Sequence, residues 1–141
     1  MKAGLFGLSG KVAIVTGGNG GIGLGIARGL ARAGAALLLV GRDAAKTERA
    51  VAEIATLGGE ASGAVADVTV EADCHAFAEA ALQRHARIDI LVNNAGTNWR
   101  KPPEAYSLEE WRALIDANLT SAFLATMAVF PAMQRQGAGK I

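Results

Sequence analysis

The sequence predicts an α/β protein with a doubly wound parallel sheet, in which helices cover both faces of the sheet. Short apolar runs alternate four times with longer amphipathic stretches, at spacings of about 25 residues, and such strand–helix units join by right-handed crossovers into a parallel sheet. Glycine is abundant at 18 residues, whereas aromatic residues make up 5%. This composition is typical of strands that meet tight turns and of small residues that let helices lie close to a sheet.

The first half of the chain predicts two strands, each followed by a helix. Each strand is a short apolar run, which indicates burial on both faces. The first helix carries Ile22 and Ile26 at helical spacing, and Gly34 follows it as a C-terminal cap. The four elements, in order, are Lys11–Thr16, Gly21–Ala33, Leu37–Val40 and Asp43–Leu57.

The second half continues the alternation. Ser107 and Glu110 form a capping box at the start of a long helix, because the serine hydroxyl and the glutamate carboxylate satisfy each other's free backbone N–H groups. Lys140–Ile141 predicts the first residues of a fifth strand, so we expect the sheet to be truncated there. The elements before that point are a strand at Ala61–Ala66, a helix at Glu71–Ala86, a strand at Ile88–Val92 and the helix from Ser107 to about Gln136.

Length and charge restrict the kinds of partner. The 141 residues fit one domain, 1–141, and an apolar content of 51% is sufficient for a core. The 14 basic and 13 acidic residues nearly cancel, which argues against nucleic acid or an anionic membrane as partner. We therefore expect a small-molecule partner.

The sequence favours a cytoplasmic protein. Cys74 is the single cysteine, so an intrachain disulfide is impossible. Met1–Leu8 is too short for a secretory signal, and no run approaches the roughly 18 uninterrupted apolar residues of a membrane span. His75 and His85 lie ten residues apart on a predicted helix, with no acidic or thiol cluster that completes a metal site, so we expect no metal site.

A glycine-rich segment follows the first strand and opens the first helix, the context in which such a fingerprint is specific. A pyrophosphate must approach the backbone closely there, and the helix N-terminus offers unpaired N–H groups and a partial positive charge. A glycine-rich turn without a ligand is the alternative. A P-loop would need a lysine after its glycines, which this segment lacks. The expected phosphate-binding residues are Gly17, Asn19, Gly20, Gly21, Ile22 and Gly23.

The segment also matches T-G-x-x-x-G-x-G, a spacing that resembles the short-chain dehydrogenase/reductase family. Asn93-Asn-Ala-Gly96, directly after the fourth strand, is similar to the N-N-A-G motif of that family, although an ordinary turn is the alternative. The resemblance implies a Rossmann-type fold, a nicotinamide dinucleotide cofactor, and hydride transfer between a secondary alcohol and a ketone. It also assigns Asn94, Ala95 and Gly96 to the cofactor pocket.

Two further positions carry this resemblance. Asp67–Val68 is similar to the pair that contacts the adenine ring in the family; capping of the next helix by Asp67 or Thr69 is the alternative. Asn118 lies on the apolar stripe of the long helix, where a polar group needs partners. The resemblance gives Asn118 a catalytic role, in holding a water of the proton relay. An asparagine satisfied inside the core is the alternative.

The end of the second strand bears on cofactor preference. An NAD site usually places an acidic residue there to bond the ribose 2′-hydroxyl, but this position is Gly41, and Arg42 follows. A guanidinium binds a 2′-phosphate in bidentate fashion. We therefore favour NADP over NAD. NAD remains the alternative because Asp43 is an acidic residue close to this position. Asp43 is also a candidate cap for the following helix.

The catalytic Tyr-x-x-x-Lys pair of the family is missing from these 141 residues. The single tyrosine is Tyr106, and position 110 is glutamate. We expect a fragment that holds the cofactor half of an oxidoreductase and has no turnover of its own, similar to sugar-acid members of the family. A dinucleotide-binding module without redox chemistry is the alternative. The resemblance also implies a homo-oligomer at full length, through the Ser107–Gln136 helix.

Overall fold

The computed structural model describes residues 6–141, and within this range the chain forms one parallel sheet with strand order β3-β2-β1-β4. Residues 1–5 of the Met1–Leu8 segment lie outside the described residues. The elements are β1 Val12–Thr16, α1 Gly21–Arg32, β2 Ala36–Gly41, α2 Ala44–Thr56, β3 Ala61–Val65, α3 Glu71–His85, β4 Ile90–Val92, η1 Pro103–Ala105, α4 Leu108–Ile115, η2 Asp116–Thr120 and α5 Ser121–Gln136.

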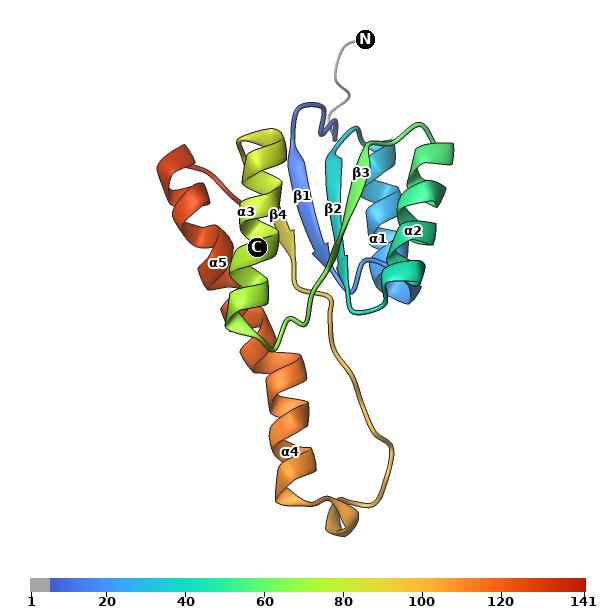
Figure 1. Ribbon diagram of the computed structural model, residues 1–141, viewed down its shortest axis with the longest axis vertical. Coiled ribbons are helices and arrows are strands. Elements are labelled where there is room, and N and C mark those ends of the chain that lie inside the picture. Colours follow the sequence, from blue (N-terminus) through green and yellow to red (C-terminus); the bar gives the residue numbers. More distant parts are fainter. Residues whose placement is uncertain (1–5) are drawn as a thin grey trace.

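Two helical layers cover the sheet, with α1 and α2 on one face and α3 and α5 on the other (Figure 1). Neighbouring residues of β1 divide between them, because successive side chains of a strand point to opposite faces. Val15 packs in the cluster with α1 and α2, whereas Ile14 packs with α3 and α5. Both faces are buried, which explains why the central strands are uninterrupted apolar runs. The doubly wound fold predicted from the sequence is confirmed.

The order of the strands creates a crevice at one edge of the sheet. β1 pairs with β2 on one side and with β4 on the other, both in parallel register. The chain therefore reverses its direction of winding at β1, and ligands of open α/β sheets bind at such a switch point, outside the carboxyl ends of the strands.

The long helix predicted from Ser107 onward is interrupted. The capping box is present: Ser107 Oγ accepts from the Glu110 backbone N–H at 3.1 Å, and the Glu110 carboxylate accepts from the Ser107 backbone N–H at 2.9 Å. A π-helical turn, η2, separates α4 from α5, and the Ser121 N–H bonds to the Asp116 carbonyl oxygen across it. α4 extends beyond the sheet, while α5 packs against α3 (Figure 1).

By length and composition alone, the Leu108–Gln136 segment could cross a membrane, because its most apolar stretch has a mean hydropathy of 1.5. α5 nevertheless buries Ala125 and Val129 in the core shared with the sheet and α3. Residues on the rest of the segment remain exposed, among them Trp111 at 56% and Phe123 at 61%. The apolar stripe of the long helix predicts that Trp111 packs onto the core, and this prediction is wrong.

The first helix packs through residues other than Ile22. Ile22 shares a helical spacing with Ile26 in the sequence, but its side chain is 79% exposed. α1 instead buries Gly23, Ala27 and Ala31. The helix approaches the sheet through its small residues, and this close approach leaves Ile22 on the outside.

The fifth-strand prediction is confirmed at its first residue. Lys140 forms a parallel bridge with Ile90 of β4. The Lys140 N–H donates to the Asp89 carbonyl oxygen, and its carbonyl oxygen accepts from the Leu91 N–H, both at 2.9 Å. Gly137 ends α5 with φ +67°, the left-handed conformation in which glycine has no Cβ penalty.

Candidate cofactor-binding site

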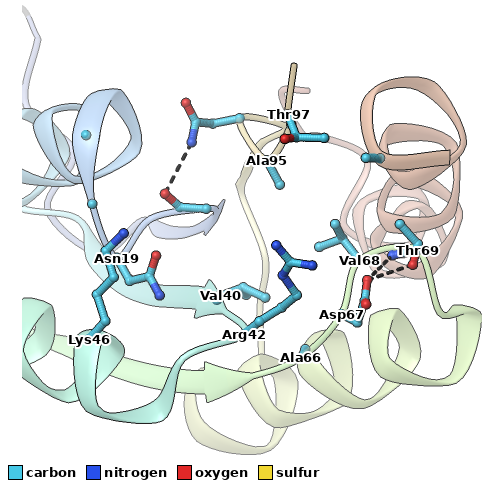
Figure 2. A pocket seen from close by; sticks show the side chains of 17 residues that line it. Asn19, Val40, Arg42, Lys46, Ala66, Asp67, Val68, Thr69, Ala95 and Thr97 are labelled. Atoms are coloured by element: carbon cyan, nitrogen blue, oxygen red, sulfur yellow. Dashed lines mark hydrogen bonds between the residues drawn. The ribbon is translucent and has the colours of Figure 1, made fainter. Parts of the chain in front are cut away.

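A cavity of about 430 Å³ lies at the carboxyl ends of the strands, at the switch point beside β1. Figure 2 shows its lining side chains, most of which lie at the carboxyl ends of the four strands and in the loops that follow them. Its volume is in the range of small-molecule sites. The lining residues are Gly17, Asn19, Gly20, Gly21, Val40, Gly41, Arg42, Lys46, Ala66, Asp67, Val68, Thr69, Asn94, Ala95, Gly96, Thr97 and Ala117.

The glycine-rich loop forms one wall of this cavity. Gly17 and Gly21 have φ values of +63° and +51°, which L side chains rarely adopt. Open space surrounds Gly21 where a Cβ would be, so a ligand can reach its backbone. Gly23 serves a different purpose, because a Cβ there would lie 2.2 Å from the Gly17 carbonyl oxygen. Gly23 therefore permits close packing of α1 on the loop and does not line the cavity.

Asn94 fastens the end of β4 to this loop. Its side-chain Nδ2 donates to the carbonyl oxygens of Thr16 at 3.0 Å and Gly17 at 3.2 Å. The Thr16 hydroxyl oxygen in turn accepts from the backbone N–H groups of Asn94 and Ala95, each at 3.1 Å. These bonds satisfy backbone groups at the carboxyl ends of β1 and β4. The Asn-Asn-Ala-Gly segment is thus a bracing element between two strands as well as a cavity wall.

Asp67 forms a local turn at the end of β3 and does not cap α3. Its Oδ1 accepts from the Thr69 N–H at 2.9 Å and from the Thr69 hydroxyl at 2.7 Å, while the N-terminus of α3 has no side-chain cap. The capping alternative for Asp67 and Thr69 is therefore wrong. The bonds from Thr69, helped by the positive charge of Arg42, hold the pKa of Asp67 below its ordinary value. Asp67 is an ionised acceptor on the cavity wall.

The carboxyl end of β2 has no free acidic group. The Asn19 side chain lies over Gly41, where a Cβ would be 2.1 Å from Asn19 Nδ2. Asn19 is held there by a bond to the Thr47 hydroxyl at 3.0 Å. Asp43 caps α2 through the Lys46 N–H at 2.8 Å, as its sequence position indicated. Neither position 41 nor Asp43 offers a carboxylate to the cavity.

Asn118 bonds to the loop that follows β4. Its Oδ1 accepts from the Thr97 N–H at 3.2 Å, and its Nδ2 donates to the carbonyl oxygens of Thr97 at 2.8 Å and Leu114 at 2.9 Å. It also approaches Gly96, where a Cβ would lie 2.6 Å from its Oδ1. The residue is exposed within η2, so the alternative of an asparagine buried in the core is wrong. Asn118 lies one residue from the cavity wall at Ala117.

Most of the predicted site residues come together in the cavity. Ile22, Gly23 and Asn118 are the ones that do not line it. The sequence reasoning did not single out Lys46, because its approach to Gly20 joins residues that are far apart in the sequence. The other lining residues that it missed are Val40, Gly41, Ala66, Thr69, Thr97 and Ala117.

Three features define a Rossmann-type α/β protein. They are a parallel sheet with a switch point at β1, a glycine-rich loop that opens α1, and a cavity across the strand ends. Residues 11–141 match the family model for short chain dehydrogenases. The chain belongs to the short-chain dehydrogenase/reductase family.

Similar proteins have named activities and bound ligands. The chain is 44% identical over 138 residues to gluconate 5-dehydrogenase of Gluconobacter oxydans, covering 97% of this chain and 54% of that protein. It is 38% identical over 138 residues to the rhamnolipids biosynthesis 3-oxoacyl-[acyl-carrier-protein] reductase of Pseudomonas aeruginosa, covering 96% and 52%. A crystal structure of a metagenomic short-chain oxidoreductase in complex with NADP superposes with a TM-score of 0.88 at 42% identity, covering 94% of this chain and 60% of that one. The chain thus spans about half the length of the curated relatives it matches.

Proposed function

We propose that this chain is the cofactor-binding part of an NAD(P)-dependent oxidoreductase that interconverts a secondary alcohol and a ketone. The observation that carries the proposal is the meeting of the glycine-rich loop with Asp67 and Asn94 around one cavity at the strand ends. The nicotinamide ring would supply the chemistry, by accepting or giving a hydride. The residues of this chain bind and orient it.

The polar groups of the cavity suit a dinucleotide. Gly20 and Gly21 offer backbone N–H groups at the N-terminus of α1, which has no side-chain cap of its own, and such a terminus favours a pyrophosphate. We assign Asp67 and Val68 to the adenine ring. We assign Asn94, Ala95 and Gly96 to the nicotinamide half of the cofactor.

We propose NADP as the preferred cofactor. The β2 end has no carboxylate for a ribose 2′-hydroxyl, since Asn19 lies over Gly41 and Asp43 caps α2. Arg42 faces the cavity in the position to meet a 2′-phosphate. The NADP complex of the similar metagenomic oxidoreductase is in line with this preference.

Substitution of a loop glycine tests the proposal. Gly21→Asp places a negative charge where the pyrophosphate would lie, and aspartate tolerates the left-handed backbone better than most residues. Gly10→Asp is the matched control, because Gly10 also has a positive φ and open space but lies outside this cavity. Calorimetric titration should show binding of NADP⁺ to the unmodified chain and to Gly10→Asp, and loss of binding in Gly21→Asp. Failure of the unmodified chain to bind either NADP⁺ or NAD⁺ contradicts the proposal.

Catalysis requires residues beyond those of this chain. The family resemblance calls for a serine and a Tyr-x-x-x-Lys pair, whereas Tyr106 bonds to the Trp99 carbonyl oxygen and Glu110 pairs with Lys101. We propose that Asn118 contributes to the proton relay of the longer protein through its position beside the cavity. The purified chain should bind cofactor without dehydrogenase turnover. Measurable turnover refutes this point, and binding by a longer protein that also has no turnover favours a non-catalytic module.

We propose a small alcohol or ketone as substrate, with a sugar acid as the first compound to test, because gluconate 5-dehydrogenase is among the similar proteins. Arg100 is exposed on the loop after β4 and has no acidic partner within the described residues. It is our candidate for the substrate carboxylate. In a catalytically complete version, Arg100→Ala should raise KM for gluconate and leave KM for an uncharged polyol unchanged.

We propose further that the full-length protein is a cytoplasmic homo-oligomer without nucleic-acid or membrane partners. The exposed apolar residues of α4, η2 and α5 support an interface between copies. They are Leu108, Trp111, Leu119, Phe123, Met127 and Phe130.

A further inference from the structure

Lys46 occupies a space that the glycine-rich loop leaves for it. A Cβ at Gly20 would lie 2.6 Å from both Cε and Nζ of Lys46. The ammonium group of Lys46 therefore fills the place where a side chain of residue 20 would be. Gly20 has one role beyond access to its backbone, because it admits a cation from α2 to the cavity.

The position of Lys46 is unfavourable for the helix that carries it. Lys46 lies in the first turn of α2, where the helix dipole is positive and disfavours a cation. Lys46 and Arg42 form no ion pair within the described residues, where all seven pairs involve other side chains. Two cationic side chains without a direct ion pair thus line the same cavity, an arrangement that an anionic ligand stabilises.

Asn19 lies between these two cations in Figure 2, with Lys46 on one side and Arg42 on the other. The bond from Asn19 to the Thr47 hydroxyl fixes its side chain, and Thr47 itself is 2% exposed and donates to the Asp43 carbonyl oxygen at 2.8 Å. The floor between the cations is therefore a neutral amide held in place. A carboxylate at position 41 would collide with it.

We infer that Lys46 and Arg42 together clamp the 2′-phosphate of NADP, and that Asn19, fixed by Thr47, excludes the acidic side chain that NAD would require at position 41. Lys46 is thus a specificity-determining residue that binds the phosphate as a point charge, while Arg42 binds it through its planar fork. This inference rests on the proposed function, because it assumes that the cavity holds a nicotinamide dinucleotide.

Calorimetric titrations of the 141-residue chain with NADP⁺ and NAD⁺ test the inference. Lys46→Gln removes the charge with little change in length, and Arg49→Gln removes a charge from an exposed position on the same helix that lies outside the cavity. We expect Lys46→Gln to weaken NADP⁺ binding about tenfold, as for the loss of one charge-assisted contact, and to change NAD⁺ binding less than twofold. Arg49→Gln should change both less than twofold, and Lys46→Arg should retain the preference for NADP⁺.

Adenosine 2′-monophosphate and adenosine 5′-monophosphate provide a second readout. Lys46→Gln should weaken binding of the 2′-phosphate and leave that of the 5′-phosphate unchanged. Its melting temperature should equal or exceed that of the unmodified chain, because a cation leaves the helix N-terminus. Equal losses for NADP⁺ and NAD⁺, or an unchanged NADP⁺ affinity, overturn the role of Lys46 while leaving the proposed function intact. If the unmodified chain binds neither dinucleotide, both the inference and the proposed function fail.

Discussion

The side-chain amide of Asn94 donates to the carbonyl oxygen of Thr16 at 3.0 Å and thereby joins the end of β4 to the end of β1. The bond spans 78 positions of sequence. It connects two loops that both line the cavity, so stability and ligand binding depend on the same contact.

Replacement of Asn94 by alanine should destabilise the fold by about 1–3 kcal/mol, because part-buried carbonyl oxygens of Thr16 and Gly17 lose their donor. Urea denaturation followed by circular dichroism measures this change. Asn93→Ala is the control, since the Asn93 side chain is exposed and bonds to the Thr126 hydroxyl. A stability loss in Asn93→Ala as large as that in Asn94→Ala would contradict the special role of Asn94.

Two glycines of α1 should respond to alanine in opposite directions. Gly23→Ala places a Cβ against the Gly17 carbonyl oxygen and should cost about 2 kcal/mol or more, together with the affinity for dinucleotide. Gly25→Ala has open space around it within the same helix and should stabilise by about 0.5–1 kcal/mol. Thermal melts of the two variants give the comparison, and equal melting temperatures would disprove the packing argument.

Asp89 should make stability fall at low pH. The Arg87 guanidinium, with the Val12 N–H and Lys11, lowers the pKa of this carboxyl, whose side chain is 8% exposed, from an ordinary 3.8 to about 2. A depressed pKa adds stability above the unfolded-state value, and this stability is lost as pH falls from about 4 to about 2. The linked loss is about 2 kcal/mol. Denaturation midpoints measured across this range should fall steeply for the unmodified chain and for Glu48→Gln, and much less for Asp89→Asn.

Cys74 should be inert towards alkylating reagents in the folded chain. Its side chain is fully buried, and burial, with the nearby charges of Asp73 and Asp67, raises the pKa of its thiol to about 11. The reactive thiolate is therefore scarce and inaccessible at pH 8. Iodoacetamide labelling followed by mass spectrometry should be slow under native conditions and fast in urea. Rapid labelling of the native chain would show that α3 opens readily.

The exposed apolar surface of α4 and α5 should control self-association. Phe123→Glu introduces a charge into a residue that is 61% exposed, so it should not disturb the core but should oppose an interface there. Light scattering after size exclusion should show a smaller average mass for Phe123→Glu than for the unmodified chain. Glu48→Gln, on the exposed face of α2, is the control. An unchanged mass for Phe123→Glu would exclude this surface as the interface between copies of the chain.

The sheet and the phosphate loop were predictable because their signals are local. β1 and β2 are uninterrupted apolar runs bounded by glycines. No end of either strand differs from its predicted position by more than one residue. The glycines of the loop predict a turn with positive φ values, which glycine adopts most readily. Gly17 and Gly21 have such values. The capping box at Ser107 follows from residue types three positions apart.

Features that depend on tertiary contacts were not predictable. The apolar stripe through Trp111 indicated an inward face, but periodicity reports that a face is apolar and not what covers it. The packing of Lys46 beside Gly20 and of Asn19 over Gly41 joins positions more than 20 residues apart. The sequence pattern therefore places Gly41 at the end of β2. It does not explain why a side chain is excluded at position 41, because the Asn19 side chain that excludes it comes from another part of the chain.

The π-helical turn at Asp116–Thr120 sets the rotation of the residues of α4 about the helix axis relative to those of α5. Each residue of an α-helix advances by about 100°, and a π turn holds one additional residue. Deletion of one residue from this turn would rotate the two helices relative to each other by about that angle and carry Asn118 away from Thr97, although every other side chain kept its identity. The length of this turn is therefore as much a determinant of the site as the residues within it.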